Sequence, residues 1–280
     1  MEFFRSLARV SQNGKWGFIN TKGEVVAPCI YDSALNFSEG LAGVQQNGKC
    51  GFINTKGEVV VPCIYDGEKN FSEGLAPVKQ NGKCGFINTK GEVVVPCIYD
   101  DVWDFSEGFA CVEQNGKEGF INTKGDVVVP CIFDDAWGFS EGLSRVNQNG
   151  KRGFINTMGE VVVPCIYDGA GSFSEGLARV KQNGKCGFIN TKGEVVVPCI
   201  YDDVWDFSEG LAYFKQNDKY GYINTKGEVV IPCIYDLAEY FSEGLARVKQ
   251  NGKCSIINTK GKVIVAEYDV VLTFWSVVEL

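Results

Sequence analysis

Histidine is absent from the 280-residue chain, and its absence removes many familiar catalytic sites. Histidine is the commonest general base and the commonest neutral metal ligand in proteins. Ser-His-Asp and Cys-His catalytic sets, HExxH metalloprotease sites and Cys2His2 zinc sites are therefore excluded. The sequence also offers no glycine motif for phosphate and no nucleophile beside a base. We therefore expect a protein that is not an enzyme and that holds no cofactor or metal.

The chain also lacks a cationic excess and a long apolar run. Asp and Glu outnumber Lys and Arg by 35 to 27, which gives a net charge of −8. Nucleic acid and anionic lipid both select clustered Lys and Arg, so we expect neither nucleic acid nor membrane as a partner. No apolar run approaches the roughly 20 residues that span a bilayer. The start, MEFFRSLARV, lacks the features of a secretory signal, so we predict a cytoplasmic location.

One repeated unit fills the sequence instead. The segment QNGK recurs in seven copies in a period of 34 residues, and Asp218 replaces its glycine in one further copy. The consensus of the eight copies reads LARVKQNGKCGFINTKGEVVVPCIYDxxxxFSEG. Such a period indicates a stacked array, in which the terminal units depart from the consensus. We expect a single repeat domain over residues 1–280, with degenerate caps at 1–6 and 266–280.

Each copy contains two turn signals that divide it into three antiparallel strands. Asn-Gly, as in Asn13-Gly14, supplies the two positive φ angles of a two-residue type I′ loop. NTKGE places Asn at the first position of a type I turn and Gly at the following bulge position. The strands between the turns are rich in Val, Ile, Phe and Tyr, as β-strands are. Proline in the third strand predicts an edge strand or a bulge.

The two-residue loop also fixes the register of the first hairpin and hence its two faces. The expected pairs in the first copy are Gln12 with Lys15, Ser11 with Trp16, Val10 with Gly17 and Arg9 with Phe18. Alternation then places small apolar residues on one face, suited to packing against a neighbouring layer. The positions of Arg9, Ser11 and Trp16, which vary among the copies, share the opposite face. Four further variable residues precede FSEG in each copy, and we call these four the window.

The unit resembles the bacterial WG-repeat family, also called KWG repeats. The resemblance is carried by GKWGF at Gly14–Phe18 and by FINTKGEVVxPxIYDxxxxFSEGLAxV throughout the chain. The family's name-giving Trp is kept only at Trp16, and the other copies have Cys50, Cys84, Glu118, Arg152, Cys186, Tyr220 and Cys254. The resemblance implies a β-rich, often propeller-like scaffold with a binding or interaction role, and it brings no catalytic residues.

The predicted fold is all-β, a tandem array of eight 34-residue three-stranded units. Three strands fall short of the four strands in about 40–45 residues of a WD-type propeller blade. We therefore favour an open superhelical β array. An eight-unit closed ring is the alternative, because Phe274–Leu280 repeats the part of the motif that begins the chain at Phe3–Arg9.

The 12 cysteines and the clustered acids admit structural and functional interpretations. Equivalent positions of the eight copies form what we call a column. Seven cysteines share one column, and no CxxC occurs, so we interpret the cysteines as small buried side chains. Disulfides between neighbouring copies remain an alternative. The acids of YDDVWDFSEG, such as Asp100 and Asp104, lack the pattern of a calcium loop, and we expect them in solvated turns.

The leading functional prediction is a binding scaffold for protein or peptide partners. Its candidate residues are a cationic strip on the variable face and the tryptophans of the windows: Arg145, Arg179, Arg247, Lys181, Lys249, Trp103, Trp137 and Trp205. The strip favours an acidic partner, since Arg forms bidentate contacts with carboxylates. The alternatives are carbohydrate binding by the tryptophans and, for the strip, charges that serve solubility alone.

Overall fold

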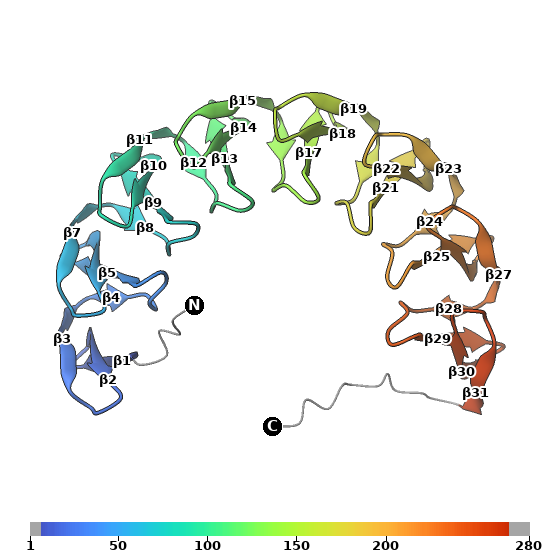
Figure 1. Cartoon of the computed structure of the whole chain (residues 1–280), viewed down its shortest axis with the longest axis horizontal. Coiled ribbons are helices and arrows are strands. Elements are labelled where there is room, and N and C mark those ends of the chain that lie inside the picture. Colours follow the sequence, from blue (N-terminus) through green and yellow to red (C-terminus); the bar gives the residue numbers. More distant parts are fainter. Residues whose placement is uncertain (1–6, 269–280) are drawn as a thin grey trace. The chain divides into compact units, whose positions relative to one another are not determined.

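The computed structural model describes residues 7–268, and the predicted cap at 1–6 and the predicted cap residues beyond 268 lie outside this range. Within the described range the chain consists of strands and turns, and no helix long and apolar enough to cross a membrane is found there. Each repeat forms one antiparallel sheet, and none of these sheets is closed (Figure 1). The predicted all-β open tandem array is therefore confirmed.

The chain divides into two compact units, Met1–Phe139 and Ser140–Leu280. The strands of the first unit are β1 (Leu7–Gln12), β2 (Lys15–Asn20), β3 (Val25–Tyr31), β4 (Ser33–Ala34), β5 (Leu41–Gln46), β6 (Lys49–Asn54), β7 (Val59–Tyr65), β8 (Gly67–Glu68), β9 (Leu75–Gln80), β10 (Lys83–Asn88), β11 (Val93–Tyr99), β12 (Asp101–Val102), β13 (Phe109–Gln114), β14 (Lys117–Asn122), β15 (Val127–Phe133) and β16 (Asp135–Ala136). The strands of the second unit are β17 (Leu143–Gln148), β18 (Lys151–Asn156), β19 (Val161–Tyr167), β20 (Gly169–Ala170), β21 (Leu177–Gln182), β22 (Lys185–Asn190), β23 (Val195–Tyr201), β24 (Asp203–Val204), β25 (Leu211–Gln216), β26 (Lys219–Asn224), β27 (Val229–Tyr235), β28 (Leu237–Ala238), β29 (Leu245–Gln250), β30 (Lys253–Asn258) and β31 (Val263–Tyr268).

A short fourth strand joins the three predicted strands in every described sheet after the first. It is formed by the first two window residues, as in β8, which pairs with β9. FSEG itself is a tight turn: Ser72 pairs with Leu75 across Glu73 (φ 52°) and Gly74 (φ 79°). The window is therefore an edge strand followed by a turn, and not only a loop.

The predicted hairpin register is confirmed residue by residue. Val10 pairs with Gly17 and Arg9 pairs with Phe18, and Asn13 and Gly14 both have positive φ. The second turn also has the predicted geometry, because Asn20 Oδ1 accepts hydrogen bonds from the backbone N–H of Lys22 and Glu24.

The third strand carries the predicted bulge at its proline. Trp16 pairs with Tyr31 whereas Phe18 pairs with Ala27, so the segment Pro28–Ile30 bulges over the residue between Trp16 and Phe18. That residue is Gly17, where a Cβ atom would lie 2.5 Å from the carbonyl oxygen of Ala27. The bulge explains why glycine follows the tryptophan position of the motif.

Both faces of an inner sheet are buried, because consecutive sheets stack face to face. One core cluster joins Phe52 and Tyr65 of the sheet β4–β7 to Ala76, Val78 and Ile87 of the next sheet. The ring of Phe52 meets that of Phe71 edge to face, with 5.0 Å between centroids. The small apolar face packs against its neighbour as predicted, and the face with the variable positions is covered by the repeat that follows.

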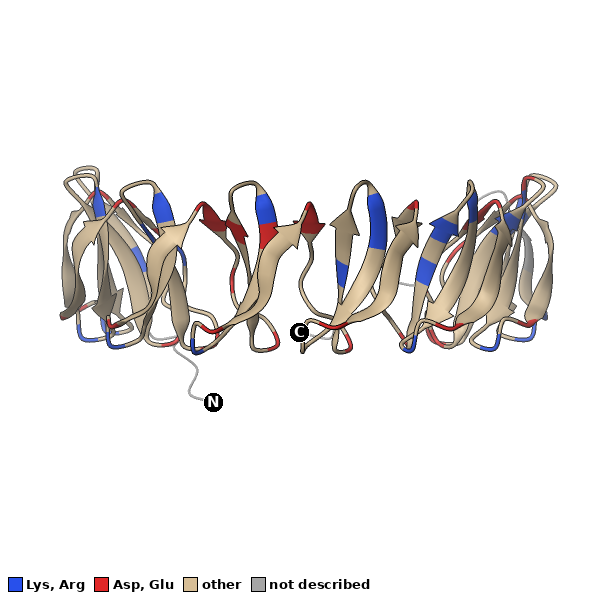
Figure 2. Ribbon diagram, turned by 90° about the horizontal axis from the view of Figure 1, so that it is seen from above, with Lys and Arg blue, Asp and Glu red and all other residues tan. Residues whose placement is uncertain are grey.

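Polar links at the turns repeat the same connection between neighbouring sheets. Asp66 forms an ion pair with Lys49 of its own repeat and accepts a hydrogen bond from the backbone N–H of Asn81 in the next repeat. The hydrogen bond from Lys49 and then that from Asn81 lower the pKa of Asp66. Many other charged residues also lie at the turns at the ends of the strands (Figure 2).

The cysteines occupy packed positions beside backbone carbonyls. Cys63 Sγ lies 3.7 Å from the carbonyl oxygen of Val44, and its column repeats this contact. Cys50 in the tryptophan column is buried, and burial is the main cause that raises its pKa to about 12. All 12 cysteines are free thiols; the five outside the shared column are buried as predicted, whereas the seven within it are only partly buried.

Candidate binding clefts between the repeats

The variable positions of one sheet face the window that joins the next sheet. Arg9, Cys111 and Arg145 occupy the same column, and each directs its side chain to the carbonyl oxygen of the second window residue, which pairs in the following sheet. The acceptors are Ala34, Ala136 and Ala170, respectively. The variable columns and the windows therefore form opposite walls of the same clefts, although they are separate segments of the repeat in the sequence.

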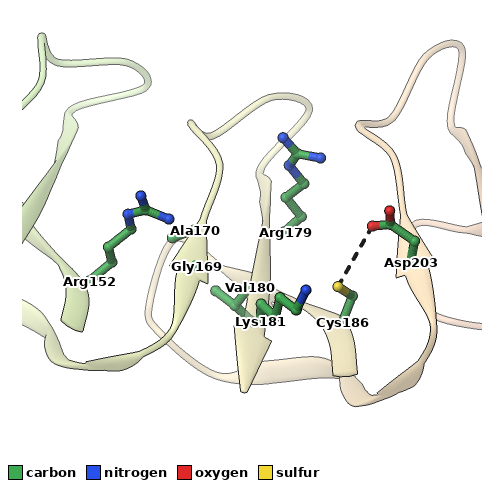
Figure 3. Close-up of a pocket in the computed structure, with 8 residues that line it drawn as sticks. All are labelled: Arg152, Gly169, Ala170, Arg179, Val180, Lys181, Cys186 and Asp203. Carbon is green, nitrogen blue, oxygen red and sulfur yellow. Dashed lines mark hydrogen bonds between the residues drawn. The ribbon is translucent and has the colours of Figure 1, made fainter. Parts of the chain in front are cut away.

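A positively charged cleft lies in the second unit (Figure 3). Its cavity of about 210 Å³ is lined by Arg152 from β18, by Arg179 and Lys181 from β21, and by Asp203 from β24. Asp203 Oδ1 accepts hydrogen bonds from Cys186 Sγ at 3.7 Å and from the backbone N–H of Val204 at 3.0 Å. Three cationic side chains thus line this cavity with a single carboxylate. We call it the cationic cleft.

Arg145 adds a third guanidinium to the surroundings of the cationic cleft. It is half-buried, and its Nη1 donates to Ala170 O at 2.7 Å. Burial first, and then the positive charges of Arg152 and Arg179, lower the pKa of Arg145. An anion placed near these positive charges would relieve their repulsion of the Arg145 guanidinium.

Only some residues of the predicted cationic strip lie near one another. Arg179 and Lys181 line the cationic cleft, with Arg145 beside it. Arg247 and Lys249 lie two repeats further along the chain, where Arg247 forms an ion pair with Glu239. Tyr213 occupies the same column in the repeat between them, so the strip is not continuous. The alternation of side chains along a strand predicts which face a residue lies on. Whether the same position is also cationic in the next repeat depends on which residue that repeat has there.

A second cleft, in the first unit, collects two of the predicted tryptophans. Trp103 and Trp137 line one cavity of about 270 Å³, together with Glu118 at the position of the name-giving Trp. We call it the tryptophan cleft. Trp205 lies elsewhere, in the second unit, and stacks on Tyr213 with 4.5 Å between ring centroids and 15° between planes.

Arg152 and Glu118 are two charged lining residues that sequence reasoning did not select as site residues. Both replace the name-giving Trp, and both were visible as charged exceptions in a column otherwise filled by Trp, Cys and Tyr. One of the acids of YDDVWDFSEG, which the sequence analysis weighed as calcium ligands, has a structural role. Asp100 forms an ion pair with Lys83 and accepts a hydrogen bond from the backbone N–H of Asn115. Asp100 therefore has the same linking role as Asp66.

These features define a tandem β-repeat protein with variable clefts between constant sheets. The chain belongs to the WG-containing repeat family. Seven consecutive segments match that family: residues 16–50, 51–84, 85–117, 119–151, 153–186, 187–220 and 220–254. Among proteins with curated descriptions, none matches the sequence.

Solved structures resemble the fold at low similarity. A eukaryotic initiation factor has a TM-score of 0.43 at 13% identity, with 94% of this chain and 84% of that chain covered. BamB from Moraxella catarrhalis has a TM-score of 0.37 at 13% identity, with coverage of 93% and 88%. Hsv2 from Kluyvelomyces marxianus has a TM-score of 0.36 at 11% identity, with coverage of 85% and 97%. Similarity at this level says nothing about what this chain binds.

Proposed function

We propose that this chain is a bacterial, non-enzymatic scaffold that binds protein or peptide partners in the clefts between its repeats. The observation that carries the proposal is that the residues that differ between copies line the same clefts. A constant sheet framework with varied contact positions is how repeat arrays recognise partners. The hydrogen bonds and apolar cores described above hold the walls of these clefts in place, so a ligand need not order them.

The cationic cleft supports an acidic segment as the bound element. Arg179 and Lys181 are both exposed, so a partner can reach them. The guanidinium groups of Arg152 and Arg179 are planar donors that match a carboxylate, and Lys181 adds a point charge. Asp206 Oδ1 lies 3.7 Å from Arg179 Nε, so an acidic segment would compete with this exposed ion pair. Hydrogen bonds to charged groups contribute about 1.5–3 kcal/mol each. Two such contacts together would contribute about 3–6 kcal/mol to the binding of one short segment.

The test measures binding of a fluorescent hexaglutamate peptide to the full chain, with hexalysine as the charge control. Arg179→Glu together with Lys181→Glu reverses two exposed charges, and we expect this variant to weaken hexaglutamate binding by at least about tenfold. Lys249→Glu is the matched control for Lys181→Glu alone, because Lys249 holds the column position of Lys181 in another repeat and the two single changes alter the net charge equally. Arg145 is left intact because its hydrogen bond to Ala170 also supports the fold.

Two results contradict the proposal. One is equal binding of hexaglutamate by the double variant and the wild type. The other is an equal loss of binding in Lys181→Glu and Lys249→Glu, which would mean that net charge and not the cleft selects the peptide. Circular dichroism melts of each variant show whether the fold is intact.

A further inference from the structure

The tryptophan cleft differs in chemistry from the cationic cleft. Its cavity is lined by five aromatic side chains and three carboxylates, and no Lys or Arg is among the lining residues. The aromatic residues are Trp103, Phe109, Phe120, Trp137 and Phe139, and the acids are Asp104, Glu118 and Asp135. The two Trp rings come from the windows of successive repeats, so they reach the cavity from different sheets.

The carboxylate of Glu118 is held in position on the wall of this cleft. Its Oε2 accepts a hydrogen bond from the backbone N–H of Ala136 and lies 3.7 Å from Cys111 Sγ. Burial is the main cause that raises the pKa of Glu118. A partly desolvated carboxylate interacts more strongly with a nearby cation than an exposed one does. Glu118 therefore supplies a fixed negative charge beside aromatic rings.

Aromatic faces beside carboxylates are the surroundings that suit an organic cation. The ring quadrupole attracts a cation placed over the face, and Trp gives the strongest attraction. Alkyl groups on the cation also gain by burial against the rings. The cavity of about 270 Å³ lies just below the roughly 300–1,000 Å³ of pockets for drug-sized ligands. It therefore suits one small head group better than an extended molecule.

We propose that the tryptophan cleft binds an alkylammonium group, with quaternary ammonium as its best ligand. This site is separate from the cationic cleft and selects the opposite charge, so either proposal can fail without the other. A cation suits the site better than a neutral sugar, because three carboxylates and no Lys or Arg are among its lining residues.

The chain supplies a matched control for this site. Trp103 and Trp205 lie in the same window sequence, DVWD, in two different repeats. Trp205 stacks on Tyr213 and also contacts Tyr220, the residue at the column position of Glu118. Trp103→Ala and Trp205→Ala thus make the same change in identical windows, and only the first removes a wall of the tryptophan cleft.

The test is a titration of the full chain with choline, followed by the indole N–H signals in NMR spectra. We expect choline to shift the signals of Trp103 and Trp137 and to leave that of Trp205 unchanged. Its neutral isostere, 3,3-dimethylbutan-1-ol, keeps the alkyl groups without the charge and should bind more weakly, with smaller shifts of both signals at the same concentration. Trp103→Ala should weaken choline binding by a factor between about 3 and 30, the range for one cation–π contact. Trp205→Ala should bind as the wild type does.

Glu118→Gln keeps the shape of the cleft and provides a second variant if Trp103→Ala fails to fold. It should weaken choline binding and leave binding of the neutral isostere unchanged. A peptide with trimethyllysine, compared with the same peptide carrying lysine, distinguishes a protein side chain from a free small molecule as the source of the group. Equal shifts with choline and its isostere, or shifts with maltose and none with choline, would overturn the proposal.

Discussion

The glycine beneath the bulge offers a direct test of how the motif builds the fold. At Gly85 a Cβ atom would lie 2.3 Å from the carbonyl oxygen of Val95 and 2.7 Å from the carbonyl carbon of Pro96. Both are backbone atoms, so the whole bulge must move to admit a side chain. Overpacking of this kind costs about 1–3 kcal/mol and occasionally more, and the short distance places Gly85→Ser at about 3 kcal/mol.

The eighth repeat shows a natural solution to the same clash. It has Ser255 where the other repeats have glycine, and its third strand reads VIVAEYD, one residue shorter than VVVPCIYD. Cys254 pairs with Tyr268 and Ile256 pairs with Val265, so the bulge over Ser255 is one residue smaller than the others. A shorter bulge therefore accompanies the added side chain.

The assay is thermal unfolding of Gly85→Ser with and without a replaced third strand. A cost of about 3 kcal/mol should lower Tm by about 6–12 °C. Replacing Val93–Asp100 by VIVAEYD in the same chain should restore part of this loss, and the replacement alone is the control. The reasoning is refuted if Gly85→Ser melts as the wild type does, or if the combined variant is no more stable than Gly85→Ser alone.

Three further predictions test the turns, the polar links and the array. Gly82 has a φ of +78° with nothing within 4 Å of an added Cβ atom, so Gly82→Val should cost about 2 kcal/mol through backbone strain alone; an unchanged Tm would contradict this. Lys83 and the Asn115 N–H lower the pKa of Asp100, so its contribution to stability is complete above an unfolded-state pKa of about 4 and is lost as pH falls through the lower folded-state value. Asp100→Asn should therefore melt below the wild type at pH 7 and together with it near pH 2, and a constant difference across pH would count against the link. Deletion of residues 35–68, one period, should leave a folded protein of seven repeats with slightly lower stability in urea titrations, and an unfolded or aggregated product would contradict stability that rests on neighbouring repeats alone.

The sequence predicts the parts of the fold that depend on local chemistry. Asn-Gly demands a two-residue loop, and that loop determines which residues pair, so the register around Val10 and Gly17 follows without tertiary information. Pro28 predicts the bulge because it cannot donate to the ladder. The two-residue strand of the window was not predicted, because windows such as GEKN and DVWD share no strand propensity and pair through backbone groups alone.

The clefts required information beyond one repeat. Alternation shows that Arg179 and Cys186 share a face with other variable positions, but it does not show what covers that face. Trp103 and Trp137 lie 34 residues apart, so the period alone could have suggested that they face one cleft. The charged replacements of the name-giving Trp, Glu118 and Arg152, were a signal of the chemistry of each cleft that the sequence interpretation recorded but did not use.

The proline bulge has a second consequence, which concerns aggregation. The third strand of every described sheet is an edge strand, and it exposes apolar side chains such as Val59 (59%) and Ile64 (48%). Exposed apolar edges are templates for pairing with another chain, and natural proteins interrupt them with proline and bulges. Pro62 removes a donor from this edge and the bulge interrupts the regular spacing of its hydrogen-bonding groups. The segment that makes room for the motif glycine therefore also disfavours pairing of this edge with another chain.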